Sequence, residues 1–430
     1  MMIMKRTILT LISLLCAFSA SAQTPSAREA IEADPLKAGG VYALYDFSDP
    51  ELTPAPKGYT PFYISHYGRH GARYIEFQGF NDKVLDLFAN AERDGKLTPY
   101  GKDLYARVQA HYDQTRHHVG DLSEKGWEQH KRIAQRIGAA YPEVFGAGTE
   151  VSASSTLLMR CAMSMSSFCL SLKDMYPGLR ITESASVSTL DELNPHAKLN
   201  PHYRGVDPND GKMSYLDPWG GCYLTFGREH VAYEAILGRI FTSMDYLRTL
   251  GEPLLFVSDL YNFIMNAQDT DTGVDMMDAF LPSELYGLWE WDNYWYWLTF
   301  GGDRYTDMPV LEHFLDRCEE DMALGRPFVR LRFGHDSIVI ALLTMLKADG
   351  MGRMPESADA IPEVFRSYEI PMASTLYFVF YRNRAGDVIF KLVHNDREVT
   401  LPLQSVSGKY YRWDDLRSSC RDLIAAARAR

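Results

Sequence analysis

Three short runs with β-strand character end in clusters of charged or hydroxyl side chains, and helical patterns follow them along the chain. The runs cover residues 61–65, 150–154 and 328–333, and the third alternates apolar with basic side chains, as a strand does. Strands that alternate with helices are typical of an α/β fold, in which helices cover both faces of one sheet. Because ligands bind beyond the C-terminal ends of strands in such folds, we expect the three polar clusters to meet at one site.

Helical periodicity supports this fold class. From residue 123 onward, one helical face collects the side chains of Trp127, His130, Ile133, Ala134 and Ile137. Further helical patterns cover residues 156–172, 229–249, 256–268 and 308–323. The stretch after residue 336 is apolar on nearly every side, which predicts a buried helix. Near the C-terminus, residues 375–381 and 388–393 flank a polar turn and predict a β-hairpin.

The first polar cluster, residues 69–73, has the sequence RHGAR and follows a predicted strand. Gly71 allows a ligand to approach the backbone closely. The guanidiniums of Arg69 and Arg73 can bind a phosphate group through paired hydrogen bonds. His70 can attack phosphorus with one ring nitrogen when the other is held by a hydrogen bond. Taken alone, the same sequence also fits a surface loop with two solvated arginines and a packed histidine.

The second and third clusters have the same position relative to their strands. Residues 154–156 are Ser-Ser-Thr at the start of a predicted helix, where hydroxyl and backbone N–H donors favour an anion, and Arg160 adds a guanidinium. In the third cluster, His335 can donate to a phosphoryl oxygen and Asp336 can protonate a leaving alcohol. Each cluster also has an ordinary structural explanation, because Ser, Thr and Asp are common helix N-caps and His335 would then be an interior histidine.

Together and in this order, the clusters resemble the histidine phosphatases, in the branch that contains histidine acid phosphatases, phytases and multiple inositol polyphosphate phosphatases. The similarity rests on residues 69–73, on Arg160 followed by Ser164, and on His335 and Asp336. Residues 122–126 also resemble a Leu-Thr-x-x-Gly stretch of that family. Residues 371–373 and 395–399 resemble the C-terminal hairpin of the inositol polyphosphate phosphatases. The resemblance covers nearly the whole chain after residue 22.

The resemblance implies a reaction and a role for each of these side chains. His70 attacks phosphorus, while Asp336 protonates the departing alcohol and then activates the water that cleaves the phosphohistidine. The phosphoryl oxygens are held by Arg69, Arg73, Arg160 and His335. These cationic and donor groups take the part that metal ions have in other phosphatases, so neither a metal nor a cofactor is expected. The expected substrate is a small-molecule phosphate ester, with inositol phosphates such as phytate among the candidates.

The resemblance also implies an architecture: a three-layer α/β core with a mixed, mainly parallel sheet flanked by helices, and a mostly helical inserted cap. We expect one histidine phosphatase domain over residues 23–430, with the cap formed by insertions at about 80–120 and 190–300. The aromatic residues between positions 289 and 300 are expected in the core of the insertion. The side chains expected to be exposed, and not to bind ligands, are those of His111, His117 and His118.

The chain departs from the family pattern at three points. Ile75 occupies a position that is usually proline. Residues 335–337 are His-Asp-Ser, as in acid phosphatases and phytases, whereas inositol polyphosphate phosphatases commonly have His-Ala-Glu. Glu76 stands just past the first cluster, where a pocket for a highly phosphorylated substrate should be basic. The preferred ester therefore stays open. A phosphotransferase or mutase of the same fold and a non-catalytic phosphate-ester binding protein also stay open.

The N-terminus predicts export. Two basic residues precede an apolar run and a small-residue stretch that together cover residues 8–22, which is the pattern of a signal peptide over residues 1–22. Neither this run nor any later one is long enough for a permanent membrane-spanning helix, so no stable membrane insertion is expected. A lipoprotein anchored through Cys16 fits less well, because Leu15 precedes that cysteine. We therefore expect the mature chain in the periplasm or outside the cell.

Charge and cysteine content exclude several other classes. The sequence has 44 basic and 56 acidic residues, a formal net charge of −12 at pH 7. An overall negative field disfavours nucleic acid and anionic membranes as partners, so an anion must be bound by a local basic pocket. The five cysteines after the predicted signal peptide are widely spaced, and the absence of a Cys-x-x-Cys pair argues against zinc and thioredoxin-like sites. Disulfide pairing and oligomeric state stay open.

Overall fold

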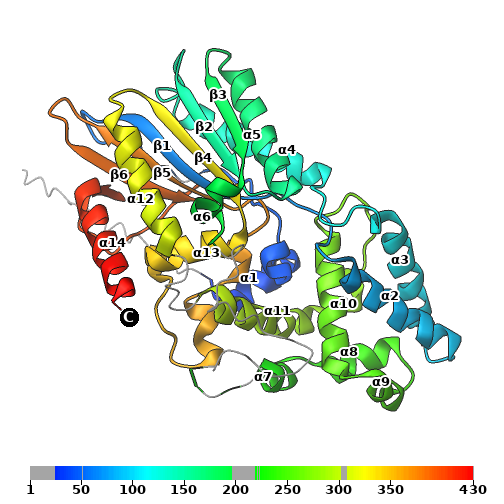
Figure 1. The fold of residues 1–430 in the computed structure, drawn as a ribbon. Coiled ribbons are helices and arrows are strands. Elements are labelled where there is room, and N and C mark those ends of the chain that lie inside the picture. The colour runs from blue at the N-terminus through cyan, green and yellow to red at the C-terminus, as the bar shows by residue number, and fades with distance from the viewer. Residues whose placement is uncertain are drawn as a thin grey trace, which may run out of the picture.

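The computed structural model describes residues 25–50, 52–195, 218–219, 221, 223–301 and 308–429. In this part of the chain one mixed sheet has the strand order β3-β2-β4-β1-β5-β6-β9-β8, and β7 pairs with β6 (Figure 1). The strands are β1 (Thr60–Arg69), β2 (Glu150–Ser155), β3 (Arg180–Ala185), β4 (Phe328–Gly334), β5 (Thr375–Arg382), β6 (Val388–His394), β7 (Arg397–Glu398), β8 (Ser405–Ser407) and β9 (Tyr410–Arg412). Strands β1 to β4 pair in parallel, and β5 continues the sheet antiparallel to β1. The predicted mixed α/β sheet and the β5–β6 hairpin are confirmed.

Helices cover both faces of the sheet because side chains on the central strands alternate between two buried cores. In β5, Phe378 and Phe380 belong to one core, and Tyr377 and Val379 belong to the other. The first core is completed by α12 (Met308–Ala323), α13 (Asp336–Met345) and α14 (Trp413–Arg428). The second is completed by α4 (Glu124–Ala140) and α5 (Met159–Met175) on the other side of the sheet (Figure 1). The predicted three-layer core is confirmed.

A second group of helices lies on the side of the molecule away from the sheet (Figure 1). These helices are α2 (Gln78–Arg93), α3 (Pro99–Thr115), α7 (Tyr223–His230), α8 (Tyr233–Ile240), α9 (Met244–Leu250), α10 (Pro253–Ala267) and α11 (Pro282–Tyr296). Helix α2 packs on α3 and α10, and α3 packs on α8. The two segments that we expect to be insertions therefore contact each other, and their boundaries at about 80–120 and 190–300 stay a prediction.

Residues 229–249, predicted as one helical stretch, are divided among three helices. Helix α8 ends at Ile240, because the backbone at residues 240 and 241 pairs with residues 97 and 98, which precede α3. The Thr98 N–H donates to the Ile240 carbonyl at 3.0 Å, and Leu97 forms an antiparallel bridge with Phe241. A contact between segments so far apart in sequence leaves no local pattern, so periodicity could not predict this break.

The prediction that His111 is exposed is wrong. Its side chain is buried, with Nδ1 3.0 Å from the hydroxyl oxygen of Thr272. The His111 ring packs edge-on against Phe263 of α10. His111 lies on the face of α3 that contacts the other cap helices. His117 and His118, beyond the end of α3, are exposed as predicted.

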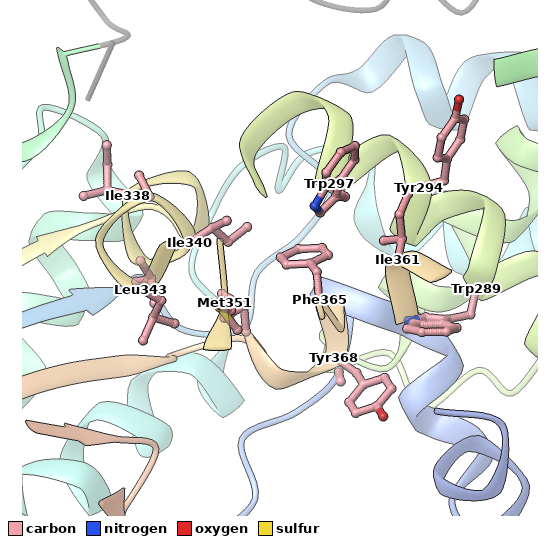
Figure 2. Close-up of a cluster of buried hydrophobic side chains, with 14 of the residues drawn as sticks. Trp289, Tyr294, Trp297, Ile338, Ile340, Leu343, Met351, Ile361, Phe365 and Tyr368 are labelled. Carbon is pink, nitrogen blue, oxygen red and sulfur yellow. The ribbon is translucent and has the colours of Figure 1, made fainter. Parts of the chain in front are cut away.

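Two elements before β1 were not predicted from the sequence: α1 (Ala27–Ala33) and the 3-10 helix η1 (Pro35–Tyr42). Both pack on α11, in which Trp289, Trp291 and Tyr294 are buried as expected, whereas Trp295 and Tyr296 are only partly buried. Figure 2 shows Trp289, Tyr294 and Trp297 on one side of Phe365, with the aliphatic side chains of α13 on the other. This apolar cluster connects the cap helix α11 to the helix that follows β4.

The predicted signal peptide, residues 1–22, lies outside the described residues, and so does Cys222. Within the described ranges, no helix is both long and apolar enough to cross a membrane. The other four cysteines after residue 22 are buried free thiols: Cys161, Cys169, Cys318 and Cys420.

Candidate active site

The ends of strands β1, β4 and β2 meet, and they bring the three polar clusters together. Arg69 at the end of β1 is in register with Gly334 at the end of β4. The His70 N–H donates to the Gly334 carbonyl at 2.9 Å, and the Thr156 N–H, just past β2, donates to the Phe333 carbonyl at 3.0 Å. Each cluster is therefore fixed to its neighbour by a backbone hydrogen bond, as the α/β interpretation predicted.

His70 is buried, and one hydrogen bond defines which ring nitrogen is free. Its Nδ1 lies 2.9 Å from the carbonyl oxygen of Gly71. A carbonyl only accepts, so Nδ1 carries the proton and Nε2 presents its lone pair. Burial lowers the pKa of His70 well below its usual value, and the positive charges of Arg160, Arg69 and Arg73 lower it further. The imidazole is thus neutral, which is the form that can act as a nucleophile.

The loop that carries His70 is held by side chains in the second turns of α4 and α5. The Gly71 N–H donates to the Ser164 hydroxyl at 3.0 Å, and the Ala72 N–H donates to the Gln129 side-chain oxygen at 2.8 Å. A Cβ atom on Gly71 would collide with the backbone of Gly126. Glycine is required here for close approach of two backbones, and this contact explains the Gly126 that follows the predicted helix start.

Arg69 is fully buried and has three oxygen neighbours. One Nη donates to the carbonyls of Val41 at 2.5 Å and Ile370 at 3.0 Å, and the other lies 2.9 Å from Oδ2 of Asp336. The carbonyls orient the guanidinium, because both come from backbone segments that pack around the end of β1. Arg69 therefore links the first and third clusters directly.

Arg73 connects the site to the cap and to the 3-10 helix η1, which ends at Tyr42. Its guanidinium lies over the Tyr42 ring at 5.7 Å, and its carbonyl accepts a hydrogen bond from Nδ2 of Asn266, at the end of α10, at 3.0 Å. The sequence analysis assigned no role to either residue. Neither position carries a motif, and both reach Arg73 only through long-range packing.

His335 and Asp336 stand at the start of α13. Nε2 of His335 lies 3.4 Å from the Thr156 hydroxyl, and its ring centroid is 5.7 Å from that of His70. Burial first, then Arg160, lowers the pKa of His335 to about 4. Asp336 is not the N-cap that the structural alternative assumed, because His335 occupies that position and Asp336 is the first helical residue. Its Oδ1 accepts a hydrogen bond from the adjacent Ser337 N–H at 2.8 Å.

Glu76 contacts two of the site arginines directly. Its Oε1 is 2.5 Å from an Nη of Arg160 and 3.3 Å from an Nη of Arg73. Burial alone would raise the pKa of Glu76, but the charges of Arg73 and Arg160 outweigh it and lower the pKa to about 2. One carboxylate oxygen therefore bridges two guanidiniums. The sequence placed Glu76 near the first cluster, but it could not show which side chains it contacts.

Taken together, the structure brings all six predicted site residues to one place, and adds a seventh, Glu76. The arrangement presents a neutral imidazole nitrogen among three guanidiniums, a second imidazole and a carboxyl group. Guanidiniums suit the oxygens of a tetrahedral anion, and the imidazole can accept a phosphoryl group. Chemically, the site can bind a phosphate ester and transfer its phosphoryl group.

Comparison with known proteins shows which solved structures have the same fold. Neither a protein-family model nor a curated protein sequence matches this chain. Among solved structures, the Bifidobacterium longum multiple inositol polyphosphate phosphatase in complex with inositol hexasulfate is similar, with a TM-score of 0.68 and 16% identity over 90% of this chain and 98% of that chain. The phytase from D. castellii has a TM-score of 0.63 and 13% identity over 91% and 85%. The chain therefore has the α/β fold with a helical cap that these phosphatases share.

Proposed function

We propose that this chain, which has the fold of the inositol polyphosphate phosphatase and phytase structures, hydrolyses phosphate monoesters through a phosphohistidine on His70. The neutral, buried imidazole among the guanidiniums of Arg69, Arg73 and Arg160 carries this proposal. A free Nε2 lone pair supplies the nucleophile, and the cations supply the charge that the phosphoryl group needs as bonds to phosphorus change.

In the first step, the phosphoryl oxygens bind the three guanidiniums and His335. Nε2 of His70 attacks phosphorus, the bond from phosphorus to the ester oxygen breaks, and Asp336 gives its proton to the departing alcohol. The products of this step are the free alcohol, a phosphohistidine and an ionised Asp336. Asp336 is the first residue of α13, and its Oδ2 faces Arg69. This position supports a role for its carboxyl group beside the bound phosphoryl group.

In the second step, the ionised Asp336 takes a proton from water as the water oxygen attacks phosphorus. The bond from phosphorus to Nε2 breaks, orthophosphate forms, and His70 returns to its neutral state. The carboxyl is thus an acid in the first step and a base in the second, so both states are regenerated in each cycle. Nδ1 keeps its hydrogen bond to the Gly71 carbonyl throughout, which fixes the reacting nitrogen.

Inositol phosphates are the substrates to test first. The support comes from the neighbours, since one structure is a multiple inositol polyphosphate phosphatase with inositol hexasulfate bound and another is a phytase. The N-terminal pattern of residues 1–22 supports export, which would bring the enzyme to phosphate esters outside the cytoplasm.

The test is release of inorganic phosphate at pH 5 in EDTA, from phytate and from p-nitrophenyl phosphate, by the wild-type chain without residues 1–22 and by His70→Ala. We expect release that persists in EDTA and is lost in His70→Ala. No release from either ester by folded wild-type protein would refute the hydrolase. Transfer of phosphate to an added alcohol, with little orthophosphate, would indicate a phosphotransferase instead.

A further inference from the structure

Glu76 places a negative charge among the cations to which the proposed function assigns the phosphoryl group. Its Oε1 contacts both Arg160 and Arg73. An Nη of Arg160 donates a hydrogen bond to this oxygen. Both arginines are buried, at 9% and 5% exposure, so neither guanidinium can reach far for another partner. A phosphoryl oxygen that bridges these two arginines needs the position that Oε1 of Glu76 occupies.

The side chain of Glu76 has room to leave. It is one-third exposed, unlike the two arginines, and it precedes Phe77, which is 64% exposed. The carboxylate therefore lies at the solvent side of the guanidiniums and can rotate outward when an anion enters. Because its pKa is about 2, the group stays charged at any pH at which the enzyme would be assayed.

We infer that Glu76 competes with the phosphoryl group for Arg73 and Arg160 and so weakens the binding of phosphate and phosphate esters. This inference rests on the proposed function. Carboxylate and phosphate oxygens accept the same guanidinium N–H groups, and a hydrogen bond to a charged group is strong enough to change an affinity by about tenfold. The competition limits retention of the product orthophosphate, which binds the same arginines.

The test measures binding of inorganic phosphate by isothermal titration calorimetry, which needs no turnover. Glu76→Gln keeps the shape of the side chain and removes its charge, so we expect phosphate to bind about tenfold more tightly than to wild type. Glu76→Asp keeps the charge, and we expect its affinity to stay near that of wild type. Glu128→Gln is the matched control: Glu128 is exposed on α4 and pairs with Lys131, so its charge is lost without a change at the arginines.

Kinetics give a second readout. Phosphate should inhibit Glu76→Gln at about tenfold lower concentration than wild type, and KM should fall for both test esters. Affinity that is unchanged or weaker in Glu76→Gln would overturn the inference, because Glu76 would then only position the arginines. An equal gain in Glu128→Gln would also overturn it, as an effect of net charge.

The two proposals fail differently. If wild type binds phosphate but Glu76→Gln gains nothing, the inference fails and the phosphatase stands. If wild type neither binds phosphate nor hydrolyses either ester, the proposed function fails, and the inference that rests on it fails as well. Melting temperatures of the variants without phosphate would show that each one is folded before its affinity is compared.

Discussion

At the scale of single residues, the environment of His70 decides what the site can do. Burial and three neighbouring guanidiniums disfavour the imidazolium, and the Gly71 carbonyl fixes the tautomer. In the proposed mechanism the arginine cluster has two effects: it attracts the anionic substrate and it keeps the imidazole of His70 unprotonated. The same charges therefore serve binding and reactivity, which explains why the three arginines are buried and not solvated.

A pH profile follows from this environment. For a histidine with its usual pKa near 6.5, the neutral fraction would fall about 25-fold between pH 7 and pH 5. Because the pKa of His70 is lowered, the neutral form persists below pH 6.5, and we expect no such loss in the rate of His70 phosphorylation at saturating substrate. Rapid-quench measurements from pH 7 to pH 5 would check this. An acid limb with a midpoint near 6.5 would contradict it.

The six predicted site residues could be found from sequence because each stands beside a strand end with its own local pattern. The role of Glu76 could not, since it depends on the side-chain contact with Arg160, 84 positions further along the chain. His111 was assigned to the surface for a similar reason. Its burial depends on Phe263 of α10, and nothing in the sequence near His111 indicates that contact.

At the scale of elements, the site depends on how closely α4 approaches the loop after β1. A Cβ on Gly126 would collide with the carbonyl of Ala72, and the neighbouring Ser123 hydroxyl donates to that same carbonyl at 3.0 Å. The predicted helix start at residue 123 is thus also in contact with the loop that carries His70. The resemblance of residues 122–126 to a family stretch has this physical basis in the present chain.

Substitution of this glycine should damage both stability and activity. We expect Gly126→Ala to lower the free energy of unfolding by about 2 kcal/mol through overpacking, and to reduce phosphate release at least tenfold by displacing the His70 loop. Urea unfolding and steady-state assays would measure the two effects. In the control Gly238→Ala, the added methyl meets nothing within 4 Å in α8, so stability should rise by about 0.5–1 kcal/mol with activity unchanged. Equal behaviour of the two variants would contradict the close-approach argument.

Element types were predictable where periodicity was strong, as in α4, α12 and the β5–β6 hairpin. Their ends were less so: α5 begins at Met159, after Thr156 has bonded to the end of β4, and not at the predicted residue 156. Helices α1 and η1 were not predicted because the Pro, Gly and Ala content of residues 23–57 suggests loops. Helix α1 begins at a capping box between Ser26 and Glu29, a start signal that is visible in the sequence.

At the scale of the whole molecule, strand order could not be derived from the sequence. The order β3-β2-β4-β1-β5 places β4 between β2 and β1. In the sequence, about 170 residues separate β4 from β2, and still more separate it from β1. That pairing brings His335 and Asp336 to His70. The fold class followed from alternation of strands and helices, whereas the assembly of the site required the long-range parallel pairing.

The core beneath the site should make stability depend on pH. His66 of β1 and His130 of α4 are buried, and burial lowers the pKa of each to about 3. The unfolded chain takes up a proton on each of them below pH 6.5 while the folded chain does not, so stability is full above that pH and falls toward pH 4. Each histidine contributes a slope of about 1.4 kcal/mol per pH unit.

Urea unfolding of His130→Leu at pH 6, 5 and 4 would isolate one of these contributions. We expect the loss of stability per pH unit to be about 1.4 kcal/mol smaller than in wild type. His117→Leu, at an exposed position, should leave the slope unchanged. Identical slopes in His130→Leu and wild type would mean that the buried ring does not resist protonation.

The central claim is that His70 itself carries the phosphoryl group. The most direct measurement is to quench the reaction within milliseconds in base, where phosphohistidine survives, and to locate the phosphate by peptide mass spectrometry. With p-nitrophenyl phosphate as the donor, whose phenolate leaves without needing a proton, we predict phosphate on the peptide that contains His70 and no phosphate there in His70→Ala. We also predict that phosphate accumulates on His70 in Asp336→Asn, because that variant cannot activate water for the second step. Phosphate release by wild type with no label on His70, or with label on another residue, would contradict the mechanism.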